Sequence, residues 1–184
     1  NLLKSITSKT KMVFINSPGN PTGWIISKKQ QALLLKHTRK LGCWLISDEV
    51  YHQITFNGLA APSFLQFSDP NDRLIVINSA SKSFDMTGWR IGWITHPREL
   101  GEHIAKLVQI TTTGVPEFLQ IGFIVALENY KNITSELRQS LKKSRDLMFD
   151  RLITWNQIEC SVPEAAFYAF FKVKGMKNSL EFAK

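Results

Sequence analysis

An amine, a carboxylate and an amide occur at intervals along the first half of this chain, each in a setting that could present it to a ligand. Lys82 follows small hydroxyl residues, Asp48 ends an apolar run, and Asn20 lies between a glycine and a proline. A lysine amine can attack a carbonyl carbon or carry a proton, and a carboxylate can keep a neighbouring group protonated. Each residue alone would be read as a solvated charge or a turn residue, so the interpretation depends on their being brought together.

The elements that must position these residues can be predicted from the pattern around them. Runs of β-branched and apolar residues at 11–16, 43–47 and 74–78 predict strands that lead directly into the three polar groups. Between the first two, Ser27 can cap a helix and Gly42 can end it. Alternating strands and helices indicate an α/β fold with a mainly parallel sheet flanked by helices, in which ligands bind beyond the carboxyl ends of the strands.

The second half of the chain is predicted to complete this part of the domain and then to form a linking helix and the beginning of a second domain. The elements expected are a strand at 91–95, helices ending near Thr112 and starting at Pro116, a long amphipathic helix at about 133–155, strands between Cys160 and Val173, and a helix capped by Asn178 or Ser179. We interpret residues 1–129 as part of a large domain, 130–155 as a linking helix, and 156–184 as the beginning of a smaller α+β domain.

The amino-acid composition argues against a membrane protein, a nucleic-acid-binding protein and a metal-binding protein. The 184 residues are 43% hydrophobic, which is enough to bury a sizeable core, and no apolar run approaches the roughly 18 residues of a membrane-spanning helix. The net charge of +8 is scattered in pairs such as Lys28–Lys29, so we expect solvated helix faces and no nucleic-acid partner. The two cysteines lack metal-ligand spacing, and we expect no metal, no membrane association and a cytoplasmic location.

The three groups, with their neighbours, match the needs of a pyridoxal-phosphate site. Such a site requires an amine for the Schiff base, for which Lys82 is placed after a buried strand. It requires an anion facing the pyridine nitrogen, and of the adjacent pair Asp48 and Glu49 we prefer Asp48.

The remaining requirements are hydrogen-bond donors and a cationic group for the phosphate. Tyr51 can donate its phenol to the ring oxygen of the cofactor, and Asn20 can direct its amide into the same crevice. Ser79 can supply a short hydroxyl contact to the phosphate, and Arg90 a planar, permanently charged guanidinium. The sequence therefore offers a candidate for every role.

With these residues assembled, the sequence resembles the class I and II aminotransferases, pyridoxal-phosphate enzymes of fold type I. The segments that carry the resemblance are Asn20–Gly23, similar to the N-P-T-G of the family, Asp48–Tyr51, similar to D-x-x-Y, Ser79–Lys82, similar to S-x-S-K, and Thr87–Gly92, similar to G-x-R-x-G. Their order and spacing fit as well.

The resemblance implies roles for individual residues. Lys82 would form the Schiff base with pyridoxal 5'-phosphate and carry the proton, and Asp48 would face the ring nitrogen. The roles of Asn20 and Tyr51 at the ring oxygen, and of Ser79 and Arg90 at the phosphate, are implied likewise, with Ser81 as a weaker phosphate candidate. A homodimer is also implied.

The resemblance covers about the middle half of a complete family member, so the large domain is expected to be incomplete. The upstream phosphate-binding helix start and the downstream arginine that grips the substrate carboxylate fall outside the chain. The fragment alone is therefore expected to be inactive.

Three functions remain open at this point. The first is transfer of an amino group between an amino acid and a 2-oxo acid. The second is a lyase or synthase that uses the same cofactor and fold, because the residues above govern the cofactor and not the choice of bond. The third is a non-catalytic sensor domain of a transcription regulator.

Overall fold

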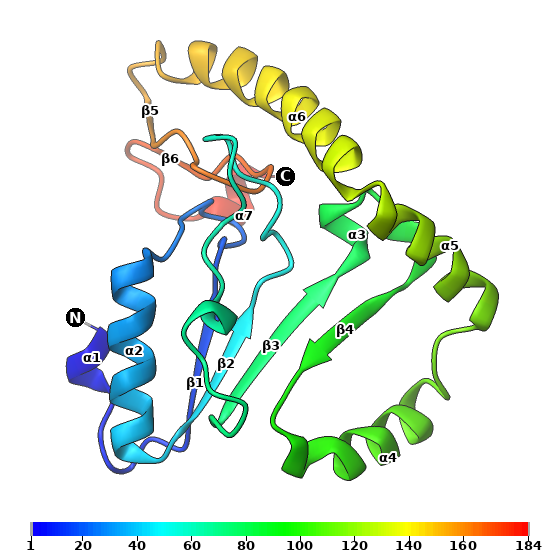
Figure 1. Ribbon diagram of the computed structural model, residues 1–184. Helices are drawn as coiled ribbons and strands as arrows, with labels where there is room; N and C mark the ends of the chain where they lie inside the picture. Colours follow the sequence, from blue (N-terminus) through cyan, green and yellow to red (C-terminus); the bar gives the residue numbers. More distant parts are fainter. Residues whose placement is uncertain (1, 184) are drawn as a thin grey trace.

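The computed structural model describes residues 2–183, which form two sheets joined by a long helix (Figure 1). The strands are β1 (Met12–Asn16), β2 (Trp44–Asp48), β3 (Leu74–Ser79), β4 (Gly92–Thr95), β5 (Ile158–Cys160) and β6 (Phe171–Val173). The α-helices are α1 (Leu2–Ser5), α2 (Lys28–Leu41), α3 (Ala80–Ser83), α4 (Gly101–Thr111), α5 (Glu117–Glu128), α6 (Tyr130–Leu152) and α7 (Ser179–Phe182). Short 3₁₀ turns are η1 (Phe64–Gln66), η2 (Thr87–Trp89) and η3 (Arg98–Leu100).

The larger sheet has the order β1-β2-β3-β4. Strands β1, β2 and β3 are parallel, and β4 pairs with β3 in the antiparallel direction, with Ser79 opposite Gly92. The reversal arises because α3 and η2 turn the chain back at the end of β3 without a helix that crosses the face of the sheet. The predicted α/β fold with a mainly parallel sheet is confirmed.

Helix α2 begins and ends where the sequence predicts. Ser27 and Gln30 form a reciprocal capping box at its start, and Gly42 adopts the left-handed conformation, with φ of 65°, at its end. Leu34 and Leu35 are buried against the sheet. Figure 1 shows α2 running beside β1.

The cluster of buried hydrophobic residues with the most members lies on the α2 face of the sheet. Its members are Ile6, Val13, Ile15, Ile26, Leu34, Leu35, Cys43, Leu45, Phe64, Leu74 and Val76. On the opposite face, the alternate residues Met12 and Phe14 of β1 are 54% and 58% exposed. One face of the parallel sheet is thus packed, although parallel sheets are normally covered on both faces.

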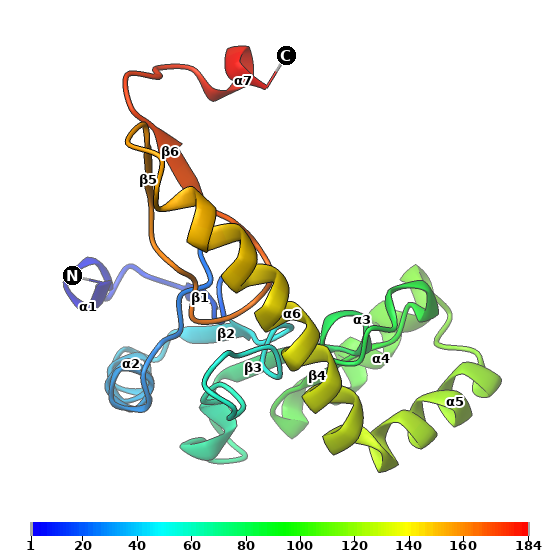
Figure 2. The same cartoon turned by 90° about the horizontal axis from the view of Figure 1, so that it is seen from above.

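Helix α6 connects the two sheets, and Figure 2 shows it extending from α5 to the β5–β6 hairpin. It starts at Tyr130, before the amphipathic pattern that begins near 133, and ends at Leu152, before 155. The strands predicted between Cys160 and Val173 are shorter than the pattern suggests, because β5 ends at Cys160, β6 begins at Phe171, and residues 161–170 form a loop that turns back to the large domain. None of the helices within residues 2–183 has the length and apolar character required to cross a membrane.

That loop contains a segment, residues 163–168, that is attached by backbone hydrogen bonds to the loops that follow β1 and β2. The amide of Ala165 donates to the carbonyl of Gly23 at 3.1 Å, and the amide of Ala166 donates to the carbonyl of Ile54 at 2.9 Å. Arg145 of α6 lies 4.1 Å from the centre of the Phe56 ring and donates to the carbonyl of Pro163 at 3.2 Å. The 163–168 segment is therefore held beside the loops that follow β1 and β2.

Candidate active site

The carboxyl ends of the parallel strands are level with one another. Asn16, the last residue of β1, pairs with Asp48, and Asp48 pairs with Ile77 of β3. The amide of Ser17 donates to the carbonyl of Asp48 at 3.0 Å, which continues the register beyond the strand. The three predicted polar groups consequently start from one edge of the sheet, as expected for a ligand site in this fold class.

Lys82 lies in the short helix α3, directly beyond β3. Ser79 fixes the start of this helix, because its hydroxyl accepts from the amide of Ser81 at 3.1 Å and donates to the carbonyl of Ile91 at 3.2 Å. The Lys82 amine is 5.7 Å from the centre of the Phe167 ring. Ser81, Lys82 and Phe167 are among the residues that line a cleft of about 210 Å³.

Asp48 and Glu49 have different environments. Asp48 is half-buried, and its side chain accepts from the amide of Val50 at 3.2 Å. Glu49 is 1% exposed and accepts from the Ser47 hydroxyl and the Phe64 amide, both at 3.0 Å. Glu49 therefore points into the core, where it ties the end of β2 to η1, and Asp48 is the carboxylate of the pair with solvent access.

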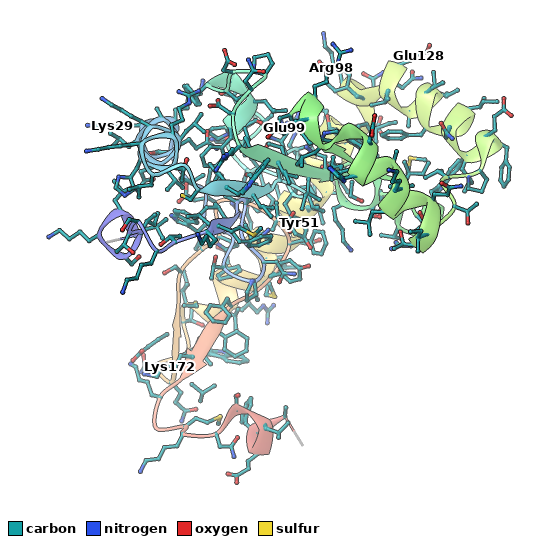
Figure 3. All side chains as sticks on the ribbon, turned by 90° about the horizontal axis from the view of Figure 1, so that it is seen from below. Lys29, Tyr51, Arg98, Glu99, Glu128 and Lys172 are labelled. Atoms are coloured by element: carbon teal, nitrogen blue, oxygen red, sulfur yellow. The ribbon has the colours of Figure 1, made fainter. Side chains whose placement is uncertain are left out.

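Tyr51 lies at the centre of the molecule, as Figure 3 shows, and its side chain is 5% exposed. Burial raises the pKa of its phenol above the ordinary value, and a hydrogen bond with Tyr168 and the charge of Asp48 act in the same direction. A hydrogen bond with the Asn20 side chain opposes the rise in pKa. Asn20, Asp48 and Tyr51 are therefore brought together.

Arg90 lies just before β4, near the end of β3, since Ser79 pairs with Gly92. It adopts the left-handed conformation with φ of 54°, is exposed, and donates to the carbonyl of Thr87 at 2.9 Å. Within residues 2–183, the side chains of Arg90, Lys82 and Asp48 form no ion pair with one another or with other residues. Among the described residues, no side chain forms an ion pair that would neutralise these charges.

Two aromatic residues of the 163–168 segment also reach this site, and the sequence reasoning missed both. The ring of Phe167 is 5.5 Å from that of Tyr51, centre to centre, and also contacts Lys82. The hydroxyl of Tyr168 is hydrogen-bonded to that of Tyr51. The aromatic run 166–170 is the signal that could have indicated them, but it lies within residues 156–184, which were predicted to begin the smaller domain.

The donor set fits pyridoxal phosphate. It contains a half-buried amine and carboxylate that form no ion pair within residues 2–183, a phenol and an amide in mutual contact, and, in the segments that end β3 and precede β4, a serine and an arginine. These groups correspond in chemistry to the aldehyde, ring nitrogen, ring oxygen and phosphate of the cofactor. The two subsets, Asn20–Asp48–Tyr51 and Ser81–Lys82, are connected through the ring of Phe167.

An open, mainly parallel sheet with this donor set at the ends of its strands defines the large domain of a fold type I pyridoxal-phosphate enzyme. The profile of the family described as "Aminotransferase class I and II" matches residues 1–184. The chain belongs to this family, which depends on pyridoxal phosphate.

Individual relatives agree with the family assignment. An aspartate aminotransferase of Bacillus subtilis is 32% identical over 100% of this chain and 48% of its own length. An LL-diaminopimelate aminotransferase of Halothermothrix orenii is 33% identical over 98% of this chain and 46% of its own. The crystal structure of an aromatic aminotransferase from Pyrococcus horikoshii superimposes with a TM-score of 0.86 at 31% identity, covering 94% of this chain and 47% of that one. The chain thus spans under half the length of these relatives.

The buried carboxyl of Glu49 leads to a prediction about stability and pH. Burial raises its pKa, so the folded protein holds this proton more tightly than the unfolded chain does. The stability that Glu49 contributes is complete below the ordinary glutamate pKa of about 4.3 and is lost as the pH rises through the folded value. Glu49→Gln cannot ionise, and its amide oxygen can accept the same two hydrogen bonds.

We therefore expect Glu49→Gln to gain stability relative to the unsubstituted protein as the pH rises from about 4 to about 7.5. Urea unfolding at the two pH values measures this difference. Glu99→Gln, at an exposed position labelled in Figure 3, is the matched control and should show no such trend. A constant difference at both pH values would mean that Glu49 does not titrate differently in the folded state.

Proposed function

We propose that the protein transfers an amino group between an amino acid and a 2-oxo acid, with Lys82 forming a Schiff base with pyridoxal phosphate. The observation that carries the proposal is the convergence of Lys82, Asp48 and Tyr51 at the level carboxyl ends of β1, β2 and β3. The family assignment supports it. No single substrate is proposed, because the relatives are named for different amino acids.

When bound, pyridoxal phosphate supplies an electron-withdrawing ring that makes the α-proton of an amino acid acidic. Lys82 would hold the cofactor covalently and, once displaced by the substrate amine, would move the α-proton. Asp48 would keep the ring nitrogen protonated through its negative charge. Asn20 and Tyr51 would donate hydrogen bonds to the ring oxygen.

The phosphate would be held by Ser79, Ser81 and Arg90. Arg90 offers a planar fork of N–H donors whose charge does not depend on pH, and no carboxylate within the described residues occupies it. Ser79 already donates to Ile91 and accepts from Ser81, so its contact with a phosphate would require its hydroxyl to rotate.

The proposal also covers the oligomeric state, the cellular location and the domain division of the protein. We propose a homodimer, which the family resemblance supports, and a cytoplasmic location, which is consistent with two unpaired cysteines. We also propose that residues 1–129 belong to the large domain, 130–155 to a linking helix, and 156–184 to a smaller domain. The span of α6 between the two sheets supports this division.

The test of the function uses the gene product at its full length. Pyridoxal phosphate is added, the visible absorbance is recorded, and borohydride reduction is followed by peptide mapping of the attached cofactor. The expected result is a reduced adduct on Lys82 and conversion of an added 2-oxo acid into an amino acid. Loss of the amine group without its transfer would favour a lyase, and no adduct on Lys82 would refute the assignment.

A further inference from the structure

Tyr168 makes a contact with Tyr51 that the roles described above do not use. The hydroxyl groups of the two residues are hydrogen-bonded, and their rings lie edge to face with centres 5.7 Å apart and an angle of 77° between them. The two residues are 117 positions apart in the chain. The contact is therefore a product of the tertiary structure and joins the smaller domain to the site.

The position of Tyr168 is fixed by the backbone. The 163–168 segment is hydrogen-bonded on one side to Gly23, in the loop that follows β1, and on the other to Ile54 and Phe56, in the loop that follows β2. Ala166 is fully buried and adopts φ of 62°, which non-glycine residues maintain only where the surroundings enforce it. A side chain on such a segment has little freedom to leave its partner.

Proton counting determines how the two hydroxyls must share their hydrogen bond. A tyrosine hydroxyl has one proton to donate and can also accept. In the proposed function, the proton of Tyr51 points to the ring oxygen of the cofactor. Either hydroxyl can donate in the hydrogen bond between the tyrosines, and once the proton of Tyr51 points to the cofactor, Tyr168 must be the donor. A hydrogen bond donated to the Tyr51 oxygen opposes the rise in its pKa, and it strengthens Tyr51 as a donor because hydrogen bonds in a chain polarise one another.

We infer that Tyr168 is a positioning residue that donates its hydroxyl proton to Tyr51 and thereby directs the proton of Tyr51 to the ring oxygen of the cofactor. The inference rests on the proposed function. Tyr168 itself does not touch the reacting atoms in this role. It acts through Tyr51, so its effect should appear in the ionisation of the bound cofactor.

The charged and titratable groups around Tyr51 are few and come from different elements. Asp48 at the end of β2 acts on it by charge, Asn20 from the loop after β1 by a hydrogen bond, and Tyr168 from the 163–168 segment by both. The amine of Lys82 lies on the Phe167 ring that also contacts Tyr51. Removing only the Tyr168 hydroxyl leaves Asp48, Asn20 and Lys82 unchanged.

The test is a pH titration of the visible absorbance of the full-length protein with bound cofactor. A hydrogen bond donated to the ring oxygen withdraws its negative charge, and that charge helps to keep a proton on the nitrogen of Lys82 once it is joined to the cofactor. Tyr51→Phe should therefore raise the midpoint pH of this absorbance titration by about 1 to 2 units. Tyr168→Phe should raise it by a fraction of that shift, about 0.2 to 0.6 unit.

Two further variants make the result specific. Tyr130→Phe changes the one tyrosine of the sequence that is neither Tyr51 nor Tyr168. Tyr130 is 42% exposed at the start of α6, and its replacement should leave the midpoint pH of the titration unchanged. In the Tyr51→Phe background, Tyr168→Phe should add no further shift, because the residue through which it acts is missing.

The outcomes separate this inference from the proposed function. If Tyr51→Phe moves the midpoint and Tyr168→Phe does not, the inference is overturned and the function stands. An additive shift in the double variant also overturns it, since Tyr168 would then act independently of Tyr51. If the unsubstituted protein shows no absorbance band that depends on Lys82, the proposed function itself fails.

Discussion

Replacing Lys82 with alanine should lower the rate of amino-group transfer by about 10⁴-fold or more. Proton transfer by a positioned side chain contributes about 10² to 10⁴ to a rate, and the variant also loses the covalent attachment of the cofactor. Single-turnover measurements on the full-length protein with a saturating amino acid isolate this loss from the release of product. The fold should be preserved, because Lys82 is half-buried and its contact is with the face of one aromatic ring.

Lys82→Arg is the matched variant for this prediction. It keeps the positive charge beside Phe167, but a guanidinium stays protonated at working pH and does not form the same bond with an aldehyde. Its rate should be as low as that of Lys82→Ala. If Lys82→Arg retained most of the activity, Lys82 would contribute only charge, and the nucleophile would have to be sought elsewhere.

Gly23→Ala should destabilise the protein by about 2 to 5 kcal/mol, as the sum of two effects. Gly23 has φ of 67°, and a side chain in the left-handed region costs about 1 to 2 kcal/mol. A β-carbon there would also lie 2.7 Å from the carbonyl oxygen of Ala165 and would collide with the ring of Pro163. Relieving such overlap typically costs about 1 to 3 kcal/mol, and here it must displace the 163–168 segment. Urea unfolding of the full-length protein measures the loss.

Gly58→Ala separates the two effects. Gly58 also has a positive φ, 85°, but a β-carbon there would meet no atom within 4 Å. It should therefore show only the backbone cost of about 1 to 2 kcal/mol. Gly23→Ala should also weaken the binding of pyridoxal phosphate, because the displaced segment carries Phe167 and Tyr168, whereas Gly58→Ala should not. Equal destabilisation by the two substitutions would show that the 163–168 segment yields to the added methyl group without cost.

The local elements of this protein follow directly from its sequence. The capping box of Ser27 and the left-handed Gly42 define α2 because caps depend on a few neighbouring residues. The strand that ends at Asp48 and the one that leads to Lys82 are apolar runs with polar residues directly after them. Since parallel strands end at one edge, the sequence alone also determined that Asn20, Asp48 and Lys82 start from the same edge of the sheet.

Only the tertiary structure decided the features that depend on distant contacts. The direction of β4 is set by how α3 and η2 turn the chain. Asp48 and Glu49 are adjacent and chemically similar, and it is the packing of Glu49 against Phe64 that leaves Asp48 accessible. The entry of Phe167 and Tyr168 into the site depends on backbone hydrogen bonds to Gly23 and Ile54. Such bonds join residues more than a hundred positions apart, and the local pattern of side chains carries no information about them.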